Sequence, residues 1–368
     1  MSIKLEEYFG KMRIVSLARR KETLEDLNRS GLDVVYKNQN GITLYPEGIH
    51  YNLKDKDEFT FLNYEDYDVF ELYTDGTLIR CFSVASTENF FFITPQCNSA
   101  CIMCPSAAAV RKLHEVKNAN WLIDIARHIP VTASHLTITG GEPFLAGLEL
   151  FDFLAFLRAK FLNTEFLILT NGRIFSIWKY ASALVMTAPA FTTIAIPIHG
   201  STEKVHDFIT QTPGSFIQTL TGIKNLLKLG AAVEVRIVVS RVNGEDLVNI
   251  AKLIIRDLAG ISYVSVMAME MTGSAAVNKS VLWEPYSKLF VKAEPAIKLL
   301  LENGIDVKLY NFPLCTVSSG YRTLCEKSIS PGKIKYSPDC SLCAAKDACG
   351  GVFNGTYYLE REDLIPLK

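Results

Sequence analysis

Short apolar segments alternate with amphipathic helical patterns between residues 91 and 310. The candidate strands are residues 91–94, 135–139, 165–170, 191–198, 232–240, 261–269 and 305–310. The candidate helices between them include residues 149–161, 215–229, 244–258 and 284–301. Alternation at this spacing is typical of repeated βα units with a parallel sheet. The sequence therefore predicts an α/β fold, a partial (β/α)6 TIM-like barrel over residues 89–305.

Two of the predicted strands carry a polar face. In residues 232–240, Glu234, Arg236 and Ser240 alternate with apolar side chains, and His135 and Thr137 do the same in residues 135–139. An ordinary small barrel fills its interior with branched apolar side chains. A polar inner face therefore predicts a cavity for a polar ligand. The alternative is an edge strand that has one face in water.

The two ends of the chain have different patterns. Residues 1–88 combine aromatic strand-like runs, turns at Asn40-Gly41 and Asp75-Gly76, and a helical pattern at residues 22–28, so we predict a small α+β domain. Residues 54–75 hold eight acidic residues against two lysines. Such a run indicates a solvated face or, alternatively, a docking surface for a basic partner. Beyond Tyr310 the periodicity ends, and we assign residues 306–368 to a cysteine-rich C-terminal region, the tail.

Composition narrows the class of protein. The net charge is −1 and 21% of the residues are charged, so we expect no nucleic-acid partner and no anionic membrane partner. The nine cysteines are odd in number and clustered, and the N-terminal residues lack a secretory pattern. We therefore expect a reducing, cytoplasmic location and metal ligation rather than disulfides. Residues 180–202 carry no charge, but Pro189 and Pro197 favour a helix followed by a buried strand over a membrane span.

Three cysteines follow the first predicted barrel strand in a C-x3-C-x2-C run, namely Cys97, Cys101 and Cys104. Thiolates of this kind hold iron–sulfur clusters, normally four to a [4Fe-4S] cluster. Three thiolates leave one iron open to bind the amino and carboxylate groups of an amino-acid-like cofactor. S-adenosylmethionine fits this role, since enzymes use it for radical chemistry. An electron from the cluster would then cleave the sulfonium and give a 5′-deoxyadenosyl radical.

A second motif, Gly140-Gly141-Glu142-Pro143, ends the second predicted strand, where the active face of a barrel lies. By itself such a run is usually a turn. Together with the cysteine run and Met103 inside it, the motif resembles the signature of the radical S-adenosylmethionine superfamily. The resemblance implies that the backbone of this turn and Glu142 hold the amino group of the cofactor.

Four further residues are weaker candidates for cofactor binding. Thr170 and Asn171 end the third predicted strand, where the superfamily often has polar residues, although Asn171-Gly172 is also a common turn. Arg236 faces the predicted cavity and would meet the cofactor carboxylate, or else pair with Glu234. Glu270 closes the sixth strand, where the superfamily contacts the adenosine, and the alternative is a loop residue. His199 and His206 are candidates for the substrate side or for structural roles.

The tail contains a second cysteine pattern. Cys340, Cys343 and Cys349 form a C-x2-C-x5-C run, which is metal-ligand spacing, and Cys315 and Cys325 compete as a fourth ligand. Four thiolates suit either a structural zinc ion or a second [4Fe-4S] cluster. The tail resembles the auxiliary-cluster domains, of the SPASM or twitch type, that follow radical barrels acting on peptides.

Several segments resemble a narrower family, the C-type radical maturase of the His-Xaa-Ser system (HxsC). They are residues 206–207, 234–236, 267–273, 278–285, 310–315, 327–330 and 349–353. The resemblance implies that Cys315 is the fourth tail ligand. It also implies a small ribosomal peptide as substrate, a second radical maturase as partner and a flavodoxin-like or ferredoxin-like electron donor. Residues 331–334 and Ala268 depart from the family pattern.

Two other functions remain open from the sequence. One is a radical enzyme of the same chemistry that acts on a small molecule or a nucleotide. The other is a non-enzymatic adaptor that binds iron–sulfur or zinc.

Overall fold

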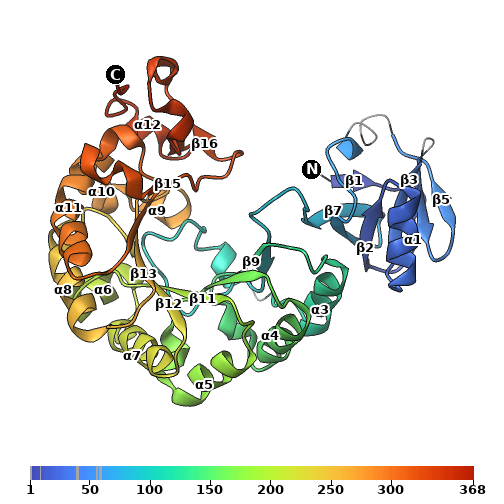
Figure 1. The fold of residues 1–368 in the computed structure, drawn as a ribbon, viewed down its shortest axis with the longest axis horizontal. Coiled ribbons are helices and arrows are strands. Elements are labelled where there is room, and N and C mark those ends of the chain that lie inside the picture. Colours follow the sequence, from blue (N-terminus) through green and yellow to red (C-terminus); the bar gives the residue numbers. More distant parts are fainter. Residues whose placement is uncertain (1, 9, 39–40, 55–56, 58–59, 114) are drawn as a thin grey trace.

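The computed structural model describes residues 2–8, 10–38, 41–54, 57, 60–113 and 115–368. Its central element is an eight-stranded sheet with the order β15-β14-β13-β12-β11-β10-β9-β8. The strands are β8 (Phe90–Phe92), β9 (His135–Thr139), β10 (Glu165–Leu169), β11 (Thr192–Pro197), β12 (Ala232–Val238), β13 (Tyr263–Met267), β14 (Val307–Tyr310) and β15 (Cys325–Glu326). Every neighbouring pair is parallel. The sheet curls into a partial barrel (Figure 1), so the predicted α/β partial barrel is confirmed.

Helices cover the convex face of this sheet (Figure 1). They are α3 (Ala119–His128), α4 (Glu149–Lys160), α5 (Trp178–Thr187), α7 (Ser215–Lys228), α8 (Leu247–Asp257) and α11 (Tyr286–Glu302). The shorter helices α6 (Glu203–Thr210), α9 (Gly273–Val277) and α10 (Lys279–Leu282) lie at the barrel mouth, where Ile209, Ala275 and Leu282 share an apolar cluster. The four predicted helices appear as α4, α7, α8 and α11. Helices α3 and α6 were not predicted. Helix α6 has only eight residues, which is short for recognition from periodicity.

Alternation along the strands separates a buried outer face from a polar inner face. Val233, Val235 and Ile237 of β12 are at most 2% exposed and belong to the core beneath the helices. Glu234 and Arg236 lie between them in sequence and so point to the inner side. Strand β12 pairs with β11 and β13, so the edge-strand interpretation was wrong. The barrel therefore has a polar wall inside.

The uncharged residues 180–202 form most of α5 and the buried strand β11, as predicted. In the described residues, no helix combines the length and the apolar character needed to cross a bilayer. Beyond residue 305, where the predicted barrel ends, β14 and β15 continue the same parallel sheet.

The N-terminal part of the chain forms a second sheet beside α3 (Figure 1), with the order β1-β7-β6-β2-β3-β4-β5. Its elements are β1 (Ser2–Lys4), β2 (Arg13–Ala18), α1 (Lys21–Arg29), β3 (Val34–Asn38), β4 (Gly41–Tyr45), β5 (Ile49–Tyr51), β6 (Val69–Leu72) and β7 (Thr77–Phe82). A turn follows at Asp75-Gly76 as predicted, whereas Asn40 of the other predicted turn and part of the acidic run lie outside the described residues.

Buried polar contacts join this sheet to the barrel. Ser16 Oγ and His128 Nδ1 lie 2.8 Å apart. Glu71 of β6 accepts hydrogen bonds from Lys117 Nζ and Trp121 Nε1, each at 2.8 Å. These contacts fix the N-terminal sheet against the first barrel helix.

The tail packs over the barrel mouth on the opposite side (Figure 1). It contains β16 (Ile334–Lys335), β17 (Val352–Phe353) and α12 (Tyr357–Glu360). Thr356 Oγ1 accepts a hydrogen bond from the backbone N–H of Met271 at 3.0 Å. The buried carboxylate of Glu360 accepts from the backbone N–H of Tyr286, the first residue of α11, at 3.2 Å.

Burial of Glu360 makes the stability of the docked tail sensitive to pH. Burial raises the pKa of Glu360 to about 8, although the N–H of Tyr286 acts in the opposite direction. Because folding favours the protonated carboxyl group, its contribution to stability is full below the ordinary glutamate pKa and is lost as the pH rises through 8. Between pH 5 and pH 8.5 we expect the free energy of unfolding to fall by about 3–4 kcal/mol more in the native protein than in Glu360→Gln, since one pKa unit corresponds to about 1.4 kcal/mol. Denaturant titrations at both pH values measure this difference, and equal slopes would contradict it.

Candidate functional site

The cysteine loop, residues 95–106, follows β8 on the concave side of the sheet (Figure 1). The thiols of Cys97, Cys101 and Cys104 are free and half-buried. The pKa of Cys101 is raised to about 12, first by burial and then by the neighbouring thiols of Cys97 and Cys104. The three cysteines lie in one loop, and their joint binding of a cluster stays a prediction.

In the part of the chain that the structure describes, no three His, Cys, Asp or Glu side chains converge closely enough to hold a single metal ion. A [4Fe-4S] cluster makes a different demand, because each thiolate binds a different iron. Three free, neighbouring thiols in one loop meet that demand. The donor set therefore fits an iron–sulfur cluster better than a lone ion.

Two distant helices hold the cysteine loop in place. The backbone N–H groups of Ala100 and Ile102 donate to the last residues of α6, Thr210 and Ile209, at 3.0 and 2.9 Å. Near the C-terminal end of the loop, the N–H of Ser274 in α9 donates to the carbonyl of Cys104 at 3.0 Å. These partners are more than 100 residues away in sequence, so spacing alone could not reveal them.

The Gly140-Gly141 turn packs directly on the cysteine loop. Gly141 N–H donates to Thr94 and Glu142 N–H donates to Gln96, both at 2.7 Å. A β-carbon built on Gly141 would lie 2.2 Å from the carbonyl oxygen of Gln96. Glycine is thus required here for contact between the two motifs. The two sequence motifs are brought together, as expected for one site.

Glu142 joins the ends of two strands. Its side chain is buried, and it accepts hydrogen bonds from Thr170 Oγ1 at 2.8 Å, from Asn171 N–H at 2.7 Å and from Phe144 N–H at 3.2 Å. Burial raises the pKa of this carboxyl group, whereas these donors lower it. Glu142 therefore positions the loop after β10, and its expected contact with a cofactor ammonium group stays a prediction.

The loop after β10 also reaches the cysteine loop. Asn171 Nδ2 donates to Asn98 Oδ1 at 2.7 Å. Arg173 Nη1 donates to the Asn98 carbonyl at 2.6 Å and to Ser99 Oγ at 3.1 Å. Sequence reasoning found Asn171 but missed Asn98 and Arg173. The sequence feature that could have pointed to Arg173 is its position two residues after Asn171, at the end of a predicted strand.

Arg236 forms the ion pair that was the alternative to cofactor binding. Its Nε and Nη2 donate to the two oxygens of Glu234 at 2.7 and 3.2 Å. Glu234 is fully buried and also accepts from Ser265 Oγ at 2.6 Å and from Tyr263 Oη at 3.1 Å. These residues of β12 and β13 form a hydrogen-bonded polar floor within the barrel.

The remaining candidates lie at the mouth of the barrel or behind it. Glu270 follows β13 and pairs with Lys333 of the tail at 3.4 Å. Met103 is 6% exposed and packs in an apolar cluster with Met269 and Met271. Pro143 is buried in the turn after Glu142.

His199 and His206 lie next to each other in the structure. His206 Nδ1 accepts a hydrogen bond from the backbone N–H of His199 at 3.2 Å. Burial lowers the pKa of His199 to about 3 and that of His206 to about 4. Both rings are therefore neutral at physiological pH.

Four tail cysteines surround one cavity, namely Cys315, Cys340, Cys343 and Cys349. Among the described residues, Cys325 is not part of its lining and instead lies in β15. Backbone N–H groups approach these sulfurs, with Leu314 and Gly351 donating to Cys349 Sγ and Leu367 to Cys343 Sγ, each at 3.4 Å. Such donors are typical around cluster sulfurs. The lining thus includes Cys315 and not Cys325, and the assignment of the fourth ligand stays a prediction.

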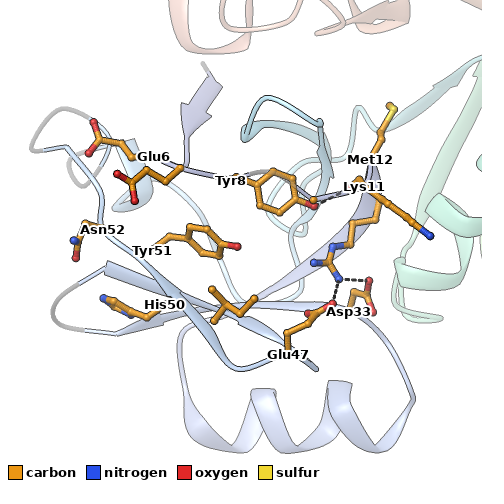
Figure 2. A pocket seen from close by; sticks show the side chains of 13 residues that line it. Glu6, Tyr8, Lys11, Met12, Asp33, Glu47, His50, Tyr51 and Asn52 are labelled. Atoms are coloured by element: carbon orange, nitrogen blue, oxygen red, sulfur yellow. Dashed lines mark hydrogen bonds and ion pairs between the residues drawn. The ribbon is translucent and has the colours of Figure 1, made fainter.

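A separate cavity lies in the N-terminal sheet (Figure 2), and its lining comes entirely from residues 6–52. The rings of Tyr8 and Tyr51 pack edge to face with their centroids 5.9 Å apart, and Arg13 Nη1 donates to Asp33 at 3.1 Å and to Glu47 at 2.8 Å. The charge of Arg13 is therefore paired with the carboxylates of Asp33 and Glu47 within the N-terminal sheet. The cavity contains none of the predicted site residues.

Comparison with known proteins identifies the barrel. Residues 91–254 match the model of the radical SAM superfamily, so the chain contains a radical SAM domain. A search of curated proteins gave no match.

Three solved structures are similar to this chain, and one of them reaches a TM-score of 0.50. SuiB of Streptococcus suis bound to S-adenosylmethionine has a TM-score of 0.50 and 15% identity, covering 63% of this chain and 51% of that one. The same SuiB bound to its precursor peptide SuiA has a TM-score of 0.49 and 15% identity, covering 63% and 49%. A structure of anSMEcpe with bound AdoMet has a TM-score of 0.48 and 16% identity, covering 60% and 62%. The chain spans about half the length of the SuiB chains, and identities this low show the fold alone.

Proposed function

We propose that this protein is a radical S-adenosylmethionine enzyme that modifies a ribosomally synthesised peptide. One electron from a bound [4Fe-4S] cluster would cleave S-adenosylmethionine into methionine and a 5′-deoxyadenosyl radical, which abstracts hydrogen from the peptide. The observation that carries the proposal is the contact between the cysteine loop and the Gly140-Gly141 turn within a radical SAM domain.

The residues of the site divide into three roles. Cys97, Cys101 and Cys104 bind the cluster. The turn at Gly140 and Gly141 presents backbone to the cofactor. The positioning set is Met103, Glu142, Pro143, Thr170 and Asn171, which fix the cysteine loop and the neighbouring strand ends.

The concave wall supplies the rest of the site. Arg236 is one-fifth exposed while its Nε and Nη2 bind Glu234, so its remaining N–H groups stay available for a carboxylate. Glu270 follows β13 and forms an ion pair with Lys333. We assign it to the side of the site that would contact the adenosine of the cofactor. The wall keeps these groups in fixed positions before any ligand arrives, which lowers the cost of orienting one.

Two features favour a peptide as the substrate. The tail carries a second cysteine site, as in the auxiliary-cluster domains of enzymes that modify peptides, which the sequence resembles. The polar inner face formed by Glu234, Arg236 and Ser265 also suits a peptide backbone better than an apolar small molecule. The His-Xaa-Ser system resembled by residues 267–273 and 349–353 suggests a His-Xaa-Ser peptide, a second maturase and a flavodoxin-like or ferredoxin-like donor. A small molecule or nucleotide remains the competing substrate, and a cytoplasmic location stays a prediction.

The test begins with anaerobic reconstitution with iron and sulfide. Dithionite and S-adenosylmethionine are then added, and 5′-deoxyadenosine is measured against Cys97→Ala. Absence of this nucleoside above the control would contradict the enzymatic function. Mass spectrometry of a synthetic peptide with His-Xaa-Ser repeats, compared with a scrambled peptide, then tests the substrate class. Equal modification of both, or of neither while free nucleotides react, would favour the competing substrate.

The tail site makes its own prediction. Cys340→Ala removes one of the four sulfurs that surround the tail cavity, so we expect it to lose about four irons of about eight, the content of two cubanes. Cys325→Ala, the matched control from β15, is expected to keep them. Metal analysis of both variants measures the difference. One zinc beside about four irons in the native protein would instead assign a structural zinc site, and a loss of iron in Cys325→Ala alone would overturn the choice of Cys315.

A further inference from the structure

An arginine from outside both sequence motifs lies against the cysteine loop. Arg111 belongs to a short 3-10 turn, Val110–Lys112, that follows the loop. Its Nη1 approaches the carbonyl of Cys101 at 3.4 Å, and its Nη2 donates to Ser274 Oγ at 2.9 Å. The backbone of Ser274 binds the carbonyl of Cys104 at 3.0 Å. The guanidinium group is therefore held between the second cysteine and the helix that binds the third.

Arg111 therefore places a positive charge beside the cysteine loop, with Nη1 3.4 Å from the carbonyl of Cys101. Arginine keeps its charge at every ordinary pH, so this charge is permanent. Arg173 is held on the loop by hydrogen bonds to Asn98 and Ser99, whereas Arg111 approaches the cysteine backbone itself.

We propose that Arg111 is a positioning residue that makes the cluster of the cysteine loop easier to reduce, with Ser274 holding its guanidinium in place. Reduction adds one negative charge to a cluster that already carries three thiolates. A fixed cation beside these ligands stabilises the reduced state more than the oxidised one. Charges and hydrogen bonds near the sulfurs are known to set cluster potentials. The inference rests on the proposed function, because it requires that the loop binds a cluster.

The test compares reduction potentials in four full-length proteins. These are the native protein, Arg111→Gln, Arg111→Lys and Lys112→Gln, the last of which removes an exposed cation from the adjacent position. Each protein is reconstituted anaerobically and titrated against redox mediators. The reduced cluster is followed by electron paramagnetic resonance, using the signal that changes on addition of S-adenosylmethionine. Iron content is measured on the same samples.

We expect Arg111→Gln to shift the potential to more negative values, Arg111→Lys to stay near the native value, and Lys112→Gln to shift it less than Arg111→Gln. Equal potentials in Arg111→Gln and Lys112→Gln would overturn the inference. So would equal shifts in Arg111→Lys and Arg111→Gln.

If Arg111→Gln takes up no iron in the loop, the lysine variant decides. Iron retained in Arg111→Lys supports a requirement for positive charge, and iron lost in Arg111→Lys as well overturns the inference. A native protein without any responsive signal would instead contradict the proposed function. The two failures are therefore distinguishable.

Discussion

Replacing Cys101 by alanine should abolish cleavage of S-adenosylmethionine and lower the iron content of reconstituted protein from about eight to about four atoms per chain. Cys101 lies between Cys97 and Cys104 in the cysteine loop. With two thiolates left, the cluster of the loop loses a ligand while the tail site keeps all four. The assay is 5′-deoxyadenosine formation together with iron analysis.

The matched control is Cys81→Ala. Cys81 is largely buried in β7 of the N-terminal sheet and donates to the carbonyl of Val69 at 3.4 Å. It belongs to neither cysteine set, so its loss should leave both iron content and nucleoside formation unchanged. Native activity and native iron in Cys101→Ala would remove the catalytic role of the loop.

The second large effect is expected from Gly141→Ala. The added methyl group would lie 2.2 Å from the Gln96 carbonyl oxygen and 2.4 Å from that of Pro95. Both are backbone atoms of the cysteine loop, so no side-chain rotation relieves the clash. The loop or the turn must move, and a displacement of about 1 Å at a reacting centre costs about 100-fold in rate. We therefore expect nucleoside formation to fall at least about 100-fold.

Gly320→Ala is the control for this substitution. No atom lies within 4 Å of a β-carbon built at Gly320, and the residue lies in an exposed turn of the tail. Its activity and its unfolding temperature should match those of the native protein. If Gly141→Ala retained native activity, the contact between the two motifs would have no importance for function.

Residue spacing and periodicity predicted the candidate site well because the residues of each motif lie close together in the sequence. Cys97, Cys101 and Cys104 lie within eight residues, and a turn such as Gly140–Pro143 has its own signature. The boundaries of the seven predicted barrel strands, which correspond to β8–β14, agree with the structure within about two residues. A buried parallel strand requires a continuous apolar outer face, and this pattern is visible in the sequence. Glu234 and Arg236 were placed on the inner face by alternation alone, and the structure shows their ion pair.

Other parts depend on contacts that no local pattern encodes. Helix α6 contacts the cysteine loop through Ile209 and Thr210, and α9 does so through Ser274. Both helices are short, with eight and five residues, so a helical pattern has too little length to reveal them. Arg111 and Arg173 have ordinary surroundings in sequence, and only folding brings each to the loop.

The sequence by itself determined the class of fold, the cysteine ligand candidates and the turn that meets them, because each depends on residue type at short spacing. Only the tertiary structure decided what surrounds those ligands. It placed Cys315 beside Cys340, Cys343 and Cys349, and it left Cys325 in β15. The physical reason is that strand pairing and helix packing join residues far apart in the chain, and their partners are chosen by the whole core.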